Sequence, residues 1–181
     1  MASVPPNPDL EFSFAIDVTQ LAVLGRDYQL AAKESERKKV AVRLGLLDLP
    51  KLNAQVHVAP AAGGLVHLNG RVEADVVQEC VVTLAPVSAT IAENFTMTFL
   101  RQAPKRAGKE IDVEPDDDPP EAIQGDVLDL GEVVVEQLAL LIDPYPRAPG
   151  AVFGARVIGE PEAPKATVSP FAVLAKLKTK S

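Results

Sequence analysis

A single amphipathic stretch between residues 125 and 147 constrains the fold most, because it carries the clearest helix signal in the chain. Asp129 is a good N-cap residue, and Glu132 follows three residues later, in the spacing of a capping box. Apolar residues then recur with helical spacing, and Pro144 cannot continue the helical hydrogen bonds. The sequence therefore predicts a helix near 130–142 that buries one face.

The chain before this helix shows the period-two alternation of β-strands from Leu52 to Leu100, with Val76–Leu84 as one of the strand segments. Gly63-Gly64 is typical of a hairpin turn, and Asn69-Gly70 is typical of a bulge or a second tight turn. Short links favour antiparallel pairing, because parallel strands need crossovers of about a dozen residues. We therefore predict an α+β fold. It consists of an antiparallel β-meander, able to curl toward a barrel, with the 130–142 helix on its core face and further helices flanking it.

The length and composition suit one folded domain, since 47% of the 181 residues are apolar and can build a sizeable core. We assign residues 11–160 to this single α+β domain. A stretch near 102–124 combines many charges with prolines and predicts a mobile acidic loop. Residues 161–181 are assigned to a C-terminal tail, in which Ser169 and Pro170 predict a short helix.

The most basic predicted helix lies at residues 36–47, with Ser35 as its candidate N-cap. Its cations and two lysines of the tail are our candidates for contact with RNA or a protein partner: Arg37, Lys38, Lys39, Arg43, Lys176 and Lys178. Solubility would explain a basic helix equally well, because the formal net charge of the chain is −7. No aromatic residues stand beside the helix to stack on bases, and no feature of the sequence predicts a DNA partner.

Candidate catalytic and metal-binding groups are few. Glu132 and Glu136 lie one helical turn apart, as an acid–base pair would, but a solvated helix face explains them more simply. His57 and His67 are predicted on facing strands, without further ligands at metal-binding spacing. Cys80 lies in an apolar run, where a buried and inert thiol is the common outcome. The sequence predicts no enzyme, no metal site and no cofactor.

The sequence also predicts a cytoplasmic protein. One cysteine cannot form an internal disulfide, and the N-terminus lacks the basic and apolar regions of a signal peptide. No apolar run is long enough to cross a membrane, so no membrane contact is expected. The oligomeric state is left open by these patterns.

Several segments together are similar to one known family. They are, in order, QECVVTLAPV, a strand ending at Phe99, an acidic proline-rich loop, and DVLDLGEVVVEQLALLIDPYPR. This order resembles the YceD family of large ribosomal RNA subunit accumulation proteins, long described as a domain of unknown function. The segments ESERKKVAVRLGL and SPFAVLAKLK resemble its alphaproteobacterial branch. The positions that match the family pattern are Cys80, Leu84, Pro86, Asp129, Glu136, Pro144 and Pro146.

The resemblance implies a bacterial, non-catalytic ribosome-biogenesis factor. Such a factor would support accumulation or processing of large-subunit ribosomal RNA by binding that RNA or an assembly partner. Two alternatives stay open: a protein-interaction adaptor without RNA contact, and a metal-dependent nuclease using Glu132 and Glu136. Many family members carry further cysteines after the central helix at metal-ligand spacing, whereas residues 144–154 contain none here. Cys80 alone cannot hold zinc, so the resemblance adds no metal site.

Overall fold

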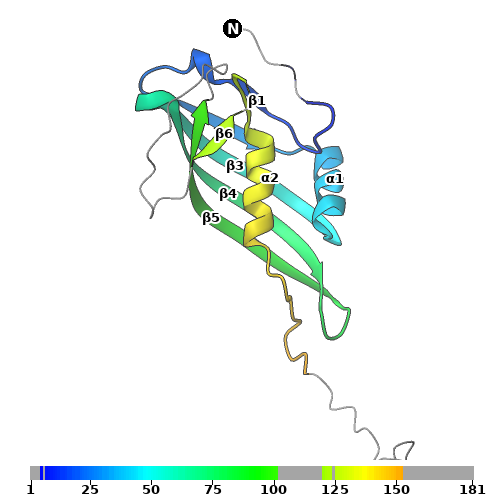
Figure 1. The fold of residues 1–181 in the computed structure, drawn as a ribbon. Helices are drawn as coiled ribbons and strands as arrows, with labels where there is room; N and C mark the ends of the chain where they lie inside the picture. The colour runs from blue at the N-terminus through cyan, green and yellow to red at the C-terminus, as the bar shows by residue number, and fades with distance from the viewer. Residues whose placement is uncertain (1–4, 6, 102–119, 124, 153–181) are drawn as a thin grey trace, which may run out of the picture. The chain divides into compact units, whose positions relative to one another are not determined.

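The computed structural model describes residues 5, 7–101, 120–123 and 125–152, and these form two sheets and two α-helices (Figure 1). The larger sheet contains β2 (Arg26–Ala31), β3 (Asp48–Pro60), β4 (Leu65–Glu79), β5 (Pro86–Arg101) and β6 (Glu121–Ile123). The smaller sheet pairs β1 (Ala15–Asp17) with β7 (Val127–Asp129). The helices are α1 (Glu34–Leu44) and α2 (Leu130–Leu141), with short 3₁₀ turns at Val18–Gln20 and Ala62–Gly64. All these elements belong to one compact unit, Met1–Pro149, and a second unit spans Gly150–Ser181.

The larger sheet confirms the predicted α+β fold and its meander. β3, β4 and β5 follow one another in antiparallel hairpins, and β2 pairs antiparallel with β3. β6 instead pairs parallel with β5, over Phe99–Arg101. The strand order β2-β3-β4-β5-β6 leaves β2 and β6 at opposite edges, so the sheet stays open and does not close into a barrel.

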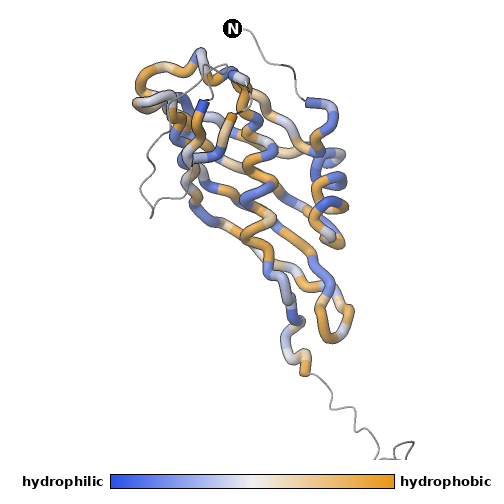
Figure 2. The backbone as a smooth tube through the Cα atoms, viewed as in Figure 1, coloured by the Kyte–Doolittle hydropathy of each residue, from blue (hydrophilic) through white to orange (hydrophobic). Residues whose placement is uncertain are grey.

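The core lies between this sheet and α2, which crosses one face of it (Figure 1). Hydrophobic and hydrophilic residues alternate along the strands (Figure 2), because successive side chains point to opposite faces. Leu68 and Val72 of β4 and Leu130, Val134 and Leu138 of α2 have no exposed surface. Burying each of these side chains contributes about 2 kcal/mol to folding. The predicted core-packed helix is therefore confirmed.

The predicted start of α2 is confirmed, whereas the predicted start of α1 is wrong. Asp129 does cap α2, because its carboxylate accepts hydrogen bonds from the backbone N–H groups of Gly131 and Glu132. The reciprocal half of the predicted capping box is absent, since the Glu132 carboxylate binds Arg43 instead. The prediction of Ser35 as the cap of α1 is wrong, because the helix already includes Glu34 and its N-cap is Lys33.

Two features of β4 correct the sequence interpretation. Asn69-Gly70 forms neither a bulge nor a turn, because Gly70 keeps regular register with Val56 on one side and Phe95 on the other. A Cβ at Gly70 would lie 2.4 Å from the Phe95 ring, so glycine leaves the space that the ring occupies. The strand also ends at Glu79, and Cys80 starts a turn in which Leu84 N–H donates to the Cys80 carbonyl.

Some predictions fall outside the described residues and stay predictions. They concern most of the acidic loop near 102–124, the tail 161–181 with its short helix, and Lys176 and Lys178. The described end of that loop contains β6, which the sequence did not predict. Within the part of the chain that is described, no helix is long and apolar enough to cross a membrane.

Candidate functional site

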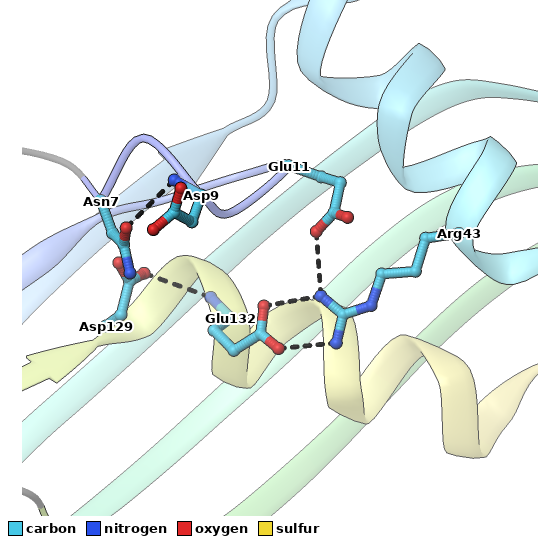
Figure 3. A network of polar contacts seen from close by, with 6 residues as sticks. All are labelled: Asn7, Asp9, Glu11, Arg43, Asp129 and Glu132. Carbon is cyan, nitrogen blue, oxygen red and sulfur yellow. Dashed lines mark hydrogen bonds and ion pairs between the residues drawn. The ribbon is translucent and has the colours of Figure 1, made fainter.

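Arg43, one of the predicted contact residues, joins three parts of the fold (Figure 3). From α1 it donates two hydrogen bonds to the Glu132 carboxylate of α2, at 2.6 and 2.8 Å, and a third to Glu11 at 3.0 Å. The bidentate geometry suits a planar guanidinium, and Glu132 is the main cause that raises the pKa of Arg43. Arg43 therefore holds together α1, α2 and residues 7–14, which we call the N-terminal segment.

Two other predicted cations also have partners within the fold. The Arg37 guanidinium donates to the carbonyl oxygens of Ala32 at 2.7 Å and Leu49 at 3.0 Å. Lys38 forms an ion pair of 2.7 Å with Glu34, and both side chains are more than 70% exposed. An exposed ion pair of this kind is weak, so a ligand can compete for Lys38. The Arg37 guanidinium is instead held by its hydrogen bonds to two backbone carbonyls.

The remaining predicted cation of α1, Lys39, lines a groove of about 600 Å³ beside the N-terminal segment. Pro8 and Leu10 form one wall, and Val42 of α1 contributes an exposed apolar side chain. Lys38 and Arg43 line the same groove. The structure thus brings three of the predicted cations together around one groove, which Asp9 and Glu11 also line.

The two candidate catalytic carboxylates have different surroundings. Glu132 is occupied by Arg43, and the half-buried Glu136 stands one turn further along α2. Burial, followed by the nearby carboxylates of Glu132 and Glu121, raises the pKa of Glu136. Among the described residues no group of three or more His, Cys, Asp or Glu side chains could hold a metal ion.

The two histidines have separate partners on neighbouring strands. His57 lies 2.7 Å from the Asp27 carboxylate across the β2–β3 pairing, and His67 lies 3.1 Å from the Thr98 hydroxyl across β4–β5. The histidines are not paired with each other in the β3–β4 register, where His57 faces Asn69 and His67 faces Ala59. They are cross-strand polar neighbours on the outer face of the sheet.

The turn between β4 and β5 and the segment after α2 meet at one place, which we call the hairpin end: residues 78–86 and 143–148. Val81 N–H donates to the Pro146 carbonyl at 2.9 Å, and the Gln78 amide donates to the Asp143 carbonyl at 2.8 Å. Five of the predicted family-pattern positions lie here: Cys80, Leu84, Pro86, Pro144 and Pro146. The sequence singled out these residues but gave no sign that they converge.

Cys80 is fully buried at the centre of the hairpin end. Its sulfur accepts hydrogen bonds from the backbone N–H groups of Val82 and Thr83 at 3.4 Å and of Ala148 at 3.2 Å. The Thr83 side chain, followed by these N–H donors, lowers the pKa of Cys80 to about 6. The thiol was predicted to be buried, and it also anchors the segment after α2 to the hairpin.

Asp129, a sixth family-pattern position, connects α2 to the N-terminal segment. Besides capping the helix, its carboxylate accepts hydrogen bonds from the Phe14 N–H at 2.8 Å and from the Ser13 hydroxyl. Gly131 makes this approach possible, because a Cβ there would lie 2.6 Å from the Phe12 carbonyl oxygen. The role of Asp129 is therefore structural, and it fixes where α2 starts.

A family model described as large ribosomal RNA subunit accumulation protein YceD matches residues 68–178, which is more than half of the chain. The chain belongs to this family. No match was found among curated proteins or among solved structures. Membership in the YceD family gives the chain a role related to ribosome biogenesis. The matched residues include most of β4 and all of β5, β6, β7 and α2, together with the hairpin end, whereas α1 precedes them.

Proposed function

We propose that this YceD-family chain is a non-catalytic, cytoplasmic factor that supports accumulation or processing of large-subunit ribosomal RNA by binding a protein of the assembly pathway. The family description supports the link to large-subunit RNA. The observation that carries the choice of a protein partner is the pairing of both α1 arginines with groups of their own chain. Arg37 and Arg43 would have to give up hydrogen bonds to carbonyl or carboxylate oxygens before they could bind phosphate.

The charge of the chain supports the same choice. RNA binding depends on lysines and arginines that neutralise phosphates and release counterions. Here the formal net charge is −7, and Glu11 and Glu132 form ion pairs with Arg43, one of the four predicted contact cations of α1. A nucleic acid repels an acidic protein, whereas a basic protein attracts it. Many ribosomal proteins are basic.

The dependence of RNA affinity on salt tests this proposal. A protein that neutralises six to ten phosphates loses about 10³- to 10⁵-fold in affinity between about 50 and 200 mM salt. We expect weak binding of a large-subunit RNA fragment, changed less than about twofold by Lys38→Gln with Lys39→Gln. Lys51→Gln is the control, because Lys51 forms an ion pair with Glu73 of β4 and does not line the groove beside α1. A steep salt dependence that the α1 substitutions abolish would instead establish direct RNA contact.

The absence of catalysis is also part of the proposal. Glu132 is held by Arg43, which supports a structural role for the carboxylate pair that a nuclease would use. We expect purified protein to show no RNA cleavage that depends on a divalent metal ion. Cleavage that requires the metal and is lost in Glu136→Gln would establish the nuclease alternative.

A further inference from the structure

Among the residues that the structure describes, no strand lies beside the outer edge of β5 along most of its length. β6 pairs with β5 over Phe99–Arg101, at the end of the strand. From Pro86 to Thr98, no described strand pairs with this edge, since β4 lies on the opposite side. The backbone N–H and C=O groups that point outward there are a template for another extended chain.

Apart from Glu93, whose side chain lies on the core side, this edge lacks the devices by which proteins normally block an exposed strand. Pairing with β4 is regular from Glu79↔Pro86 to Leu65↔Leu100, without the bulge that would twist an edge away. Between Val87 and Leu100 there is no proline, glycine or lysine, and Glu93 is the one charged side chain. Residues of high β-propensity recur along it, namely Val87, Thr90, Ile91, Phe95, Thr96, Thr98 and Phe99, between small or polar residues. A long edge of this kind is a hazard unless a partner covers it.

The side chains of β5 define what such a partner must offer. Ile91, Phe95 and Met97 point to the core side and are half-buried, so they pack against the core but stay partly open at the edge. Glu93 stands between them on the same side and is exposed. An added strand with an apolar residue at every second position would complete the burial of these side chains, and a lysine or arginine would meet Glu93.

We propose that the outer edge of β5, from Pro86 to Thr98, binds an extended and basic segment of a partner protein as an added β-strand. A second copy of the chain fits less well, because it brings the same Glu93 and the same net charge of −7. β5 lies wholly within the residues that the family model matches. The identity of the partner as an assembly protein rests on the proposed function, whereas strand addition to the edge can be tested without it.

The first experiment measures hydrogen exchange of β5 backbone amides in the isolated protein. The probe is an eight-residue peptide that alternates lysine and valine, and the control peptide has four lysines followed by four valines. At about ten times its Kd, the alternating peptide should slow every second amide between Val87 and Thr98 about tenfold. Amides of β2, at the opposite edge, should not change. Equal exchange on β5 with both peptides would overturn the proposal.

The second experiment tests the same edge in cells. Glu93→Lys should lower the amount of large-subunit ribosomal RNA relative to wild type, whereas Glu73→Lys makes the same charge change on β4, at a residue paired with both β3 and β5, and should not. Thermal unfolding checks that both variants fold. Normal RNA levels with folded Glu93→Lys would overturn the edge as the functional contact. The peptide could protect the β5 amides of wild-type protein while loss of the protein leaves ribosomal RNA levels unchanged. In that case the proposed function fails, but strand addition at the β5 edge stands. A protected β5 in a dimer without peptide would overturn the proposal in favour of self-pairing.

Discussion

At the scale of single residues, the Asp129 carboxylate connects more of the structure than a helix cap normally does. It accepts hydrogen bonds from Gly131 and Glu132 at the start of α2, and also from Ser13 and Phe14 in the N-terminal segment. Removing it would leave several donors without an acceptor at once.

Asp129→Ala is therefore expected to lower the free energy of unfolding by about 2–4 kcal/mol, more than the roughly 1 kcal/mol typical of an N-cap alone. Asp129→Asn keeps one acceptor oxygen and should cost clearly less. Urea unfolding of the three proteins measures the difference. A loss no larger than that of an ordinary cap would show that the contacts with Ser13 and Phe14 contribute little.

Cys80 is predicted to make stability depend on pH. A thiol whose pKa in the folded state lies near 6 instead of about 8.5 favours folding where it is ionised. Its contribution is complete above the unfolded pKa and is lost as the pH falls through the folded pKa. The stability advantage of wild type over Cys80→Ser should thus grow as the pH rises from about 6 to about 8.5. Urea unfolding across that window measures it, and an advantage that stays constant would contradict the stated role of the N–H donors.

At the scale of elements, the packing of the β4–β5 hairpin depends on Gly70, because the Phe95 ring occupies the space that a side chain there would need. Gly70→Ala places a methyl group against the Phe95 ring and is expected to destabilise the fold by about 1–3 kcal/mol. Gly70→Ala in a Phe95→Leu background should cost much less, because the ring that blocks the methyl group is gone. Thermal unfolding of the four variants completes the cycle. Equal costs in both backgrounds would mean that the ring does not depend on the glycine.

Local signals predicted the elements whose cause is local. The Asp129 cap, the apolar spacing of α2 and the Gly63-Gly64 turn are short-range features, and the structure contains each of them. The prediction of a bulge or turn at Asn69-Gly70 was wrong. The glycine leaves space for the ring of Phe95 on the neighbouring strand and does not form a turn. The missing half of the capping box has the same origin, since Arg43 on α1 attracts the Glu132 side chain. Tertiary contacts overrode local preferences in both cases.

At the scale of the whole molecule, the candidate site was predicted only in part. The sequence identified the α1 cations, but their carbonyl and carboxylate partners are distant along the chain and became visible only in the fold. The meeting of Cys80 with Ala148 and of Val81 with Pro146 is equally non-local. The open edge of β5 depends on strand order, which alternation patterns do not specify.

The central claim is that this YceD-family chain supports the accumulation or processing of large-subunit ribosomal RNA. The most direct measurement is a sucrose-gradient profile of ribosomes from cells without the protein, with large- and small-subunit RNA quantified in each fraction. The account predicts a selective loss of large-subunit RNA that the wild-type gene restores. An unchanged ratio of large- to small-subunit RNA in those cells would contradict it.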